Sequence, residues 1–300
     1  MGECRVFPGR PTLHEWVVHA PSGVAALSVL FENRYTMKKI AAVALLTLGA
    51  VLAGCSKQES AAPAAAPAPA AVTKIVVGLD DNFPPMGFRN EKNELVGFDI
   101  DMAREAAKRL GLEVEFKPID WSAKEAELSG KRVDALWNGL TITEERKQNI
   151  AFTAPYMENH QIIVVPANSA IKSKADLAGK VVGAQEGSSA VDAIKKEDAV
   201  FQSFKEFKTF GDNVTALMDL STGRLQAVVV DEVVGRYYVA KKPGDYAVLD
   251  DNFGTEEYGV GLRKDDTELH GKLDKALADM KQDGAAAKIA EQWFGKNIIK

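Results

Sequence analysis

The chain has 300 residues, of which 46% are hydrophobic and 26% are charged, a composition that is ordinary for a soluble globular protein and allows one to three domains. The net charge of −5 gives no reason to expect nucleic-acid binding. The sequence contains no Cys-x-x-Cys, His-Glu-x-x-His or Walker motif, so we expect no metal site, no phosphate loop and no cofactor.

Both cysteines lie in the first fifth of the chain, at Cys4 and Cys55, so we expect neither a disulfide framework nor a cysteine nucleophile in the body. Met37 is followed by two lysines and by an apolar run, residues 40–52, which is the layout of a secretory signal. The Leu-Ala-Gly-Cys end resembles the bacterial lipoprotein lipobox, in which the cysteine is lipidated. A transmembrane anchor is the alternative, but the run is shorter than the ~20 residues that a span needs.

These features divide the N-terminal part into three segments. Residues 37–54 are predicted to be a lipoprotein signal peptide. Residues 1–36 precede this complete signal and show no periodicity, so we expect Met37 to be the natural start and residues 1–36 to be a non-native leader. Residues 55–73 are predicted to be the lipidated cysteine and an Ala/Pro-rich tether, which would hold the body near a membrane.

The body begins with alternating strands and helices. Apolar runs and amphipathic spacing predict the order strand, helix, strand, helix, strand, which favours a parallel sheet with helices on its faces. The predicted elements are a strand at 74–79, a helix that starts at Phe98 and stops at Gly111, a strand at 114–117, a helix at 121–129 and a strand at 135–137.

A second α/β series follows residues 161–166. It is predicted to contain strands at 181–185, 204–210, 225–230 and 246–249, and helices at 188–196, 213–221 and 233–240. A strand at 257–263 and two helices ending near residue 295 complete the chain.

Polar residues follow the last strand of the first series. Asn138, Gly139 and Thr141 come directly after that strand, and Arg146 lies five residues further on. Hydroxyl and backbone groups can bind an ammonium, and a guanidinium can bind a carboxylate through two parallel hydrogen bonds. A free amino acid carries both groups on one carbon. The alternative is a surface ion pair between Arg146 and a neighbouring glutamate.

The segment contains the pattern G-x-T-x-T-x-x-R at residues 139–146, followed by F-[ST]-x-P-Y at residues 152–156. This pattern closely resembles the amino-acid-binding proteins of bacterial ABC importers, the family of the histidine-, glutamine- and arginine-binding proteins. The resemblance covers residues 74–295. It implies the α/β fold of type 2 periplasmic binding proteins, in which two lobes, each a mostly parallel sheet flanked by helices, are joined by two hinge crossings.

The resemblance also implies where the lobes divide. The crossings would lie near residues 161–167 and 250–256. Lobe 1 would contain residues 74–163 and 254–300, and lobe 2 residues 164–253.

Two strand ends of the second series carry polar groups that suit the ends of an amino acid. Ser188 and Ser189 open a helix whose free N–H groups favour an anion, although a plain helix cap explains them equally. In the resembled family these positions clamp the ligand's α-carboxylate from the lobe opposite Arg146. Asp231 ends an apolar strand and could also cap a helix. The family places an aspartate there for the α-ammonium, helped by the Gly139 carbonyl and the Thr141 hydroxyl.

The side-chain pocket is expected to involve five further positions. Asp80, Phe83, Trp121, Trp137 and Asn138 match positions that line this pocket in the family. Phe83 and Trp121 would sandwich the ligand, whereas Trp137 could equally pack under the sheet. Asp80 could cap its own turn, but facing the pocket it would favour a basic or hydrogen-bond-donating ligand.

The resemblance therefore implies a monomeric, extracytoplasmic receptor that binds a polar L-α-amino acid, which could be basic, delivers it to the transmembrane subunits of an ABC permease, and is anchored by lipid on Cys55. It implies no catalytic residue. One alternative is a cyclohexadienyl dehydratase on the same fold, which would need a proton-transfer group such as Glu158, Glu186 or Glu232. Another is a ligand sensor for a different membrane protein. The sequence does not identify the amino acid.

Overall fold

The computed structural model describes residues 73–300. The predicted leader, the signal peptide, Cys55 and all but the last residue of the tether lie outside the described residues. Among the helices of residues 73–300, none combines the length and the apolar character needed to cross a bilayer.

Within residues 73–300, the first lobe is built on a five-stranded sheet with the strand order β5-β1-β6-β13-β7. β1 (Lys74–Leu79) is parallel to β5 (Glu113–Pro118) and to β6 (Ala135–Leu136), as the sequence predicts. β13 (Gly261–Arg263) pairs antiparallel with both β6 and β7 (Ile150–Phe152). The C-terminal part of the chain therefore returns to the lobe in which the body begins.

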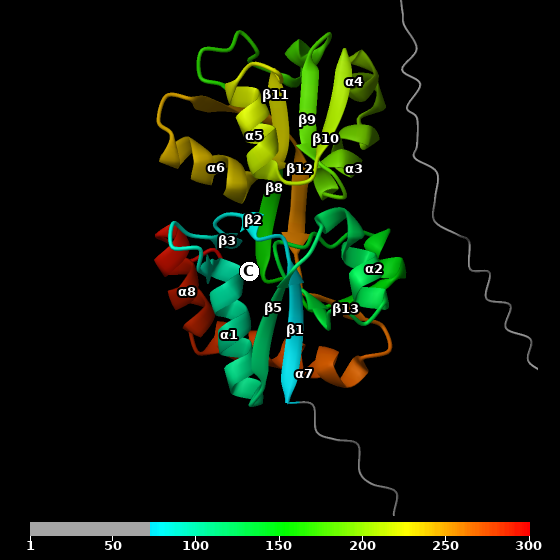
Figure 1. The fold of residues 1–300 in the computed structure, drawn as a ribbon, viewed down its shortest axis with the longest axis vertical. Coiled ribbons are helices and arrows are strands. Elements are labelled where there is room, and N and C mark those ends of the chain that lie inside the picture. The colour runs from blue at the N-terminus through cyan, green and yellow to red at the C-terminus, as the bar shows by residue number, and fades with distance from the viewer. Residues whose placement is uncertain (1–72) are drawn as a thin grey trace, which may run out of the picture. The chain divides into compact units, whose positions relative to one another are not determined.

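The helices of the first lobe pack on both sides of this sheet. Figure 1 shows α1 and α8 on one side and α2 on the other. The elements are α1 (Phe98–Leu110), α2 (Lys124–Ser129), α7 (Thr267–Gln282), α8 (Ala285–Phe294), the turns η1 (Trp121–Ala123) and η2 (Arg146–Gln148), and a small sheet of β2 (Asn82–Phe83), β3 (Gly87–Arg89) and β4 (Leu95–Val96).

Helix α1 shows how packing fixes the position of the later site. It turns Phe98, Met102 and Ala106 into the core at helical spacing. The Phe98 ring lies 5.2 Å from that of Phe294 on α8, and burial of a side chain of this size contributes about 1.5–3 kcal/mol. Asp99 follows directly in the first turn, so its carboxylate is held against the loop that comes after β6.

The second lobe has its own five-stranded sheet within the described residues, in the order β10-β9-β11-β8-β12. β9 (Val181–Gln185) is parallel to β10 (Glu206–Phe210) and β11 (Ala227–Asp231), and β8 (Met157–Pro166) is antiparallel to β11 and β12 (Tyr246–Tyr258). Its helices are α3 (Ser189–Lys196), α4 (Asp198–Ser203), α5 (Asn213–Ser221), α6 (Glu232–Lys241) and the short turn η3 (Lys174–Leu177).

The structure corrects two expectations in this lobe. The strand expected at 246–249 is too short, because β12 continues as one 13-residue strand to Tyr258. It runs extended through residues 250–256, so the crossing expected there stays a prediction. Its pairing with β8 shifts register between residues 248 and 252 and again between 252 and 255, which marks bulges in this segment. Helix α4 was not predicted; it buries none of its residues, so it leaves no apolar pattern.

Strands β8 and β12 connect the lobes. They pair over most of their length, as Figure 1 shows, and Tyr258 at the end of β12 also bridges to Thr141 of the first lobe. The predicted lobe boundaries at 163/164 and 253/254 fall inside these two strands and stay a prediction. Two extended strands that run between lobes are the usual form of a hinge.

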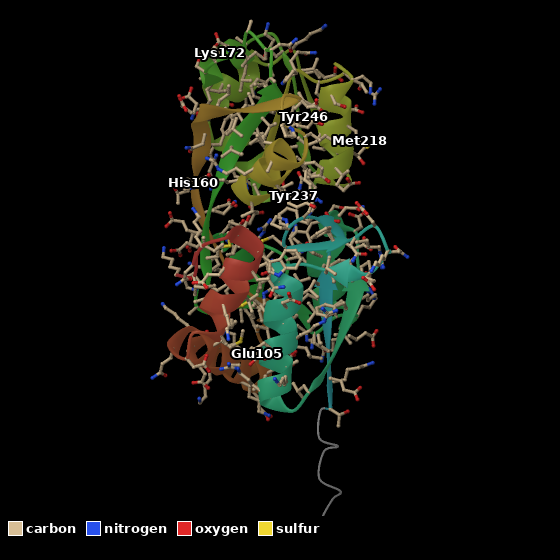
Figure 2. All side chains as sticks on the ribbon, turned by 90° about the vertical axis from the view of Figure 1, so that its left-hand side faces the viewer. Glu105, His160, Lys172, Met218, Tyr237 and Tyr246 are labelled. Atoms are coloured by element: carbon tan, nitrogen blue, oxygen red, sulfur yellow. The ribbon has the colours of Figure 1, made fainter. Side chains whose placement is uncertain are left out.

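The lobes also touch through aromatic side chains. Figure 2 shows Tyr237 of α6 on the side of the second lobe that faces the first. Its ring lies 5.7 Å from the ring of Phe88 on β3, and Phe88 in turn lies 6.1 Å from Trp293 of α8. Aromatic contact of this kind adds about 0.5–1.5 kcal/mol beyond its buried area, so it favours the closed arrangement of the lobes.

Candidate functional site

Every residue that the sequence predicts to contact a ligand is buried, and the set is drawn from both lobes. The residues are Asp80, Phe83, Trp121, Asn138, Gly139, Thr141, Arg146, Ser188, Ser189 and Asp231.

Arg146 begins the turn η2 and is only 5% exposed. Its Nη1 donates to the Thr141 carbonyl at 2.9 Å, and its Nη2 donates to the Gly187 carbonyl of the second lobe at 3.1 Å. The surface ion pair considered as an alternative is not formed, because Glu144 pairs with Lys147 instead. Burial lowers the pKa of Arg146, although a guanidinium remains charged. A buried cation therefore faces the second lobe.

Gly187 lies where the second lobe comes close to the first. Its φ of +71° is strained for other residues, and a Cβ there would lie 2.8 Å from the Ser122 Cα of the first lobe. The Gly187 carbonyl also accepts a 2.7 Å hydrogen bond from Lys124 Nζ. The sequence analysis missed Lys124, because a single lysine on a short charged helix is typical of a solvated surface. Burial lowers the pKa of Lys124 to about 8.

Thr141 and Ser189 meet across the lobes. Their hydroxyl oxygens lie 3.0 Å apart, and both also contact Glu256 Oε1, at 2.8 Å from Thr141 and 3.2 Å from Ser189. Ser188 behaves differently, because its hydroxyl donates to the Gln185 carbonyl within its own turn. Of the two serines, only Ser189 reaches the other lobe through its side chain. Glu256 is a second residue that the sequence analysis missed.

Asp231 ends β11 and occupies the N-cap position of α6, as the helix-cap alternative expects, but its carboxylate makes no cap hydrogen bond to that helix. Its Oδ1 accepts hydrogen bonds from Asn159 Nδ2 at 2.8 Å, Gln161 Nε2 at 2.9 Å and the Tyr258 hydroxyl at 2.6 Å. Burial, and next the charge of Glu256, raise the pKa of Asp231 to about 7. This carboxyl group therefore binds a proton more readily than an isolated aspartate does.

Asp80 caps its own turn and also reaches the second lobe. Its Oδ1 accepts from the Asn82 N–H at 2.8 Å, and its Oδ2 accepts from Gln185 Nε2 at 2.7 Å. Asn138 Oδ1 accepts from the Asp80 N–H at 3.1 Å, which places both side chains at the same strand ends. Burial raises the pKa of Asp80 to about 6. Gln185, which ends β9, was missed by the sequence analysis.

Gly139 is held in place by Asp99. Its N–H donates to Asp99 Oδ2 at 2.7 Å, and its φ of +59° suits glycine. A Cβ there would lie 2.9 Å from the Phe83 ring and 3.2 Å from that of Tyr258, so the loop is packed tightly between two aromatic rings. Burial raises the pKa of Asp99 to about 7.

The three aromatic residues expected at the pocket have different surroundings. Phe83 and Trp137 belong to the main apolar core, whereas Trp121 packs in a separate cluster with Leu128 and Val133. Trp137 is 1% exposed, and its ring lies 6.4 Å from that of Tyr156. The structure thus favours a core role for Trp137 and places Phe83 and Trp121 in two different apolar clusters.

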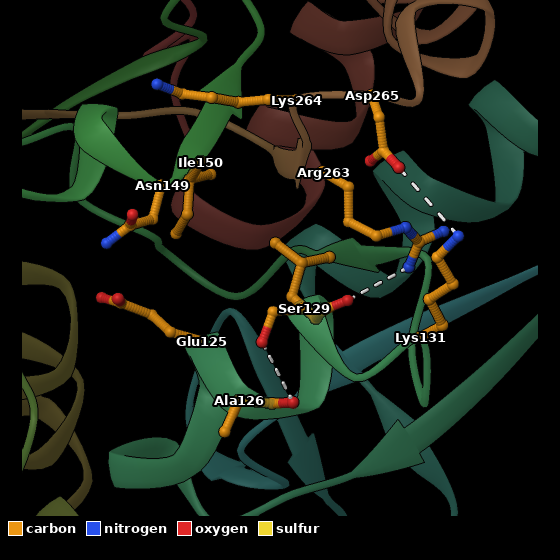
Figure 3. Close-up of a pocket in the computed structure, with 10 residues that line it drawn as sticks. Glu125, Ala126, Ser129, Lys131, Asn149, Ile150, Arg263, Lys264 and Asp265 are labelled. Carbon is orange, nitrogen blue, oxygen red and sulfur yellow. Dashed lines mark hydrogen bonds and ion pairs between the residues drawn. The ribbon is translucent and has the colours of Figure 1, made fainter.

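Two cavities of about 530 Å³ differ in their relation to these residues. One lies between the lobes and reaches Thr141, Ser189 and Glu256. The other, shown in Figure 3, lies within the first lobe and includes none of the predicted ligand residues. Its arginine, Arg263, already donates to the Leu128 carbonyl and pairs with Asp134 at 2.9 Å. Of the predicted ligand residues, only Thr141 and Ser189 line the cavity between the lobes, so it reaches one edge of the buried network that forms the candidate site.

Comparison with known proteins identifies a family and several relatives. A family model described as bacterial extracellular solute-binding proteins, family 3, matches residues 75–296. The L-cystine-binding protein TcyJ of Escherichia coli is 33% identical over 75% of this chain and 84% of its own. The histidine-binding periplasmic protein of Salmonella typhimurium is 36% identical over 87% of this chain and 99% of its own.

Solved structures of amino-acid-binding proteins are also similar to this chain. An ABC uptake transporter substrate-binding protein from Streptococcus pneumoniae with bound histidine has a TM-score of 0.73 at 35% identity, covering 76% of this chain and 95% of that one. An ancestral arginine-binding protein bound to arginine has a TM-score of 0.70 at 43% identity, covering 74% and 99% of the two chains.

Proposed function

The chain belongs to the bacterial extracellular solute-binding proteins of family 3, and from this premise we propose that it is the receptor of an ABC importer for a polar L-α-amino acid. One observation carries the proposal. Arg146 of the first lobe and Asp231 of the second are both buried, and a chain of hydrogen bonds through Thr141, Glu256 and Asn159 links them. A cation and an acid at one interlobe junction match the carboxylate and the ammonium of an amino acid.

The ligand's carboxylate binds to Arg146 and to the start of α3. The guanidinium offers two parallel donors, and the first N–H groups of a helix have no partners within the helix. Ser189 is the first residue of α3, and its hydroxyl oxygen lies 3.0 Å from that of Thr141. Arg146 donates a hydrogen bond to the backbone carbonyl of the same threonine. The positive helix end and the guanidinium therefore act on the same anion.

The ligand's ammonium binds to Asp231, with the Gly139 carbonyl and the Thr141 hydroxyl as further acceptors. Asp99 supports this arrangement, because it holds the Gly139 N–H at 2.7 Å and so fixes the loop that carries both groups. Truncating one partner of a buried charged contact costs about 2–5 kcal/mol of binding energy.

The ligand's side chain lies between Phe83 and Trp121 and ends near Asp80 and Asn138. Asp80 supplies an acceptor, whereas Asn138 Nδ2 is a buried donor without a hydrogen-bond partner in residues 73–300. This pair of groups favours a polar side chain. Relatives named for histidine, arginine and cystine fall within this class.

Closure occurs by bending of the paired strands β8 and β12. The ligand shifts the lobes toward the closed form only to the extent that it binds this form more tightly. Contacts from Arg146 to Gly187 and from Gln185 to Asp80 exist only when the lobes are together, so they add to that preference.

The same proposal includes the location and the partners of the receptor. Lipid on Cys55 anchors it to the membrane, the tether of residues 55–73 gives it reach, and it meets the permease subunits as a monomer. Loss of radiolabelled palmitate incorporation in the Cys55→Ser variant tests the anchor.

The proton-transfer groups that a dehydratase would need are poorly placed. Glu158 and Glu186 are exposed, and Glu232 is paired with Arg236 and His160. None of the three belongs to the buried network around Arg146 and Asp231. These positions favour a receptor over an enzyme.

A thermal-shift screen against the twenty amino acids and cystine tests the proposal, because a ligand that binds only the folded state raises the melting temperature. We expect a concentration-dependent rise with one or a few polar amino acids. No rise with any of them would contradict the proposal.

A further inference from the structure

Glu256 is the acid of this site to which the proposed function assigns no role. It lies on β12 opposite Asn159 of β8, where the chain passes between the lobes. Its Oε1 accepts hydrogen bonds from Thr141 of the first lobe and from Ser189 of the second. One carboxylate on a connecting strand therefore contacts both lobes.

Two amide side chains tie Glu256 to Asp231. Asn159 Nδ2 lies 2.8 Å from an oxygen of each acid, and Gln161 Nε2 lies 2.9 Å from Asp231 Oδ1 and 2.8 Å from Glu256 Oε1. Residues two apart on a strand share a face, so Asn159 and Gln161 on β8 point the same way. The same spacing places Glu256 beside Tyr258, which also bonds to Asp231.

The cluster has more acceptors than donors. All hydrogen bonds that the two acids accept within residues 73–300 reach Asp231 Oδ1 and Glu256 Oε1, so neither Oδ2 nor Oε2 has a partner there. The amide oxygens of Asn159 and Gln161 are also buried and accept no hydrogen bond in this part of the chain. An ammonium group supplies three donors and a positive charge, which is what such a cluster can bind.

The surroundings add little positive charge. Arg146 is the cation that the negative charge of Glu256 stabilises. His160 lies on the other face of β8 and hydrogen-bonds to Glu232 instead. The titratable groups that line the cavity next to Glu256 are Glu144, Glu145, Asp192, Lys196 and Glu197. Burial, and next the nearby charge of Glu256, raise the pKa of Asp231, so Asp231 binds a proton more readily than an isolated aspartate does.

We propose that Glu256 is a second ligand-contacting acid, which forms with Asp231 a two-carboxylate seat for the ammonium group of the amino acid. Because the raised pKa of Asp231 lets it hold a proton in the ligand-free protein, binding of the ammonium releases this proton to the solvent. This inference rests on the proposed function. It adds a residue to the site and predicts that binding is linked to pH.

Titration calorimetry of the full chain with L-arginine, L-histidine and L-cystine tests the inference. Repeating each titration in two buffers of different ionisation enthalpy gives the number of protons released. We expect the wild-type protein to release close to one proton at pH 6. Its affinity should fall about tenfold from pH 6 to pH 5, where the proton must be displaced at each binding event.

The variant Glu256→Gln separates the two acids. It should bind at least about tenfold more weakly than wild type at pH 8, because one acceptor charge is lost. It should release fewer protons than wild type at pH 6, because the charge of Glu256 no longer raises the pKa of Asp231, although the larger effect of burial remains. Glu256→Asp keeps the charge and should keep the proton release. The control Glu257→Gln changes the next residue, which pairs with Lys300 and is 41% exposed, and should behave as wild type.

Several outcomes would overturn the inference. Unchanged affinity and proton release in Glu256→Gln would show that Glu256 does not contact the ligand. Tighter binding would show that Glu256 competes with the ligand's carboxylate for Thr141 and Ser189. In either case the proposed function stands, because the variant still binds. Failure of the wild type to bind these probes or any other amino acid would overturn both.

Discussion

Gln185 Nε2 donates a 2.7 Å hydrogen bond to Asp80 Oδ2, and the two residues belong to different lobes. Gln185 ends β9 and Asp80 follows β1, so the contact joins the carboxyl ends of parallel strands from the two sheets. Ligands of open α/β sheets bind at such strand ends. The contact therefore lies where the two lobes meet, beside the side-chain pocket that we propose.

Substitution of Asp80 should change which amino acid is preferred. Asp80→Asn removes the buried negative charge but keeps the shape, so binding of a basic amino acid should weaken by about 2–5 kcal/mol while binding of glutamine changes much less. Calorimetric titration with arginine, histidine and glutamine measures this. Asp81→Asn is the matched control, because Asp81 pairs with Arg89 at a more exposed position. Equal losses for all three ligands would contradict a role in specificity.

The stability of the ligand-free protein should rise as the pH falls from 7.5 to 5. Burial raises the pKa of Asp80 to about 6 and of Asp99 and Asp231 to about 7, all above their unfolded values near 4. In this pH window the folded state binds more protons than the unfolded state, so the free energy of unfolding increases as the pH is lowered. Melting temperatures at four pH values test this, and Asp99→Asn should flatten the slope. A melting temperature that falls over this range would refute the assignment.

Replacing Lys124 with methionine should stabilise the ligand-free protein. Its pKa is lowered to about 8 from 10.5, so below pH 8 the folded state bears the full cost of a buried charge. Lys124→Met should therefore raise the free energy of unfolding by about 1–3 kcal/mol at pH 7. Between pH 8 and 10.5 the folded wild type loses this proton first, so the advantage should shrink toward zero. Chemical denaturation at pH 7, 9 and 10 measures this effect.

The control is Lys147→Met, which changes an exposed lysine paired with Glu144 and should shift stability by no more than about 0.5 kcal/mol. Destabilisation by Lys124→Met at pH 7 would show that its hydrogen bond to Gly187 outweighs the cost of burying its charge.

Gly187→Ala should weaken binding without unfolding the protein. The new Cβ would lie 2.8 Å from the Ser122 Cα of the other lobe and would hold the lobes apart. Gly179→Ala is a close match, since Gly179 has the same φ of +71° but no neighbouring atom within 4 Å of its Cβ position. Both variants should lose about 1 kcal/mol of stability, but only Gly187→Ala should lose affinity, by tenfold or more. Equal ligand affinities of Gly187→Ala and Gly179→Ala would contradict the claim that the lobes close around the bound ligand.

The parts of the site that the sequence predicts are those carried by local patterns. Thr141 and Arg146 belong to one short motif, and Ser189 and Asp231 lie at the ends of well-marked strands or helices. Glu256 could not be found in this way, because it hydrogen-bonds to Thr141, which lies 115 residues away in the sequence. In the run Thr-Glu-Glu-Tyr it is indistinguishable from Glu257, and only the strand pairing shows which of the two turns inward.

The same limit applies to the fold. Regular apolar alternation predicts most strands of the two parallel sets, whereas β12 carries acids and a glycine in its middle and is recognisable only through its pairing with β8. Ser188 and Ser189 are equivalent in sequence, but the first bonds within its own turn and the second reaches the other lobe. Distinctions of this kind depend on tertiary packing and not on composition.

The central claim is that Arg146 binds the carboxylate of the same amino acid whose ammonium binds Asp231. Calorimetric titration of wild type and Arg146→Ala with the amino acid found by the thermal screen, and with its α-carboxamide, tests this directly, with the exposed Arg132→Ala as control. We predict that wild type and Arg132→Ala prefer the free acid strongly, whereas Arg146→Ala loses about 2–5 kcal/mol for the acid and little for the amide. Undiminished affinity of Arg146→Ala for the free acid would contradict the claim.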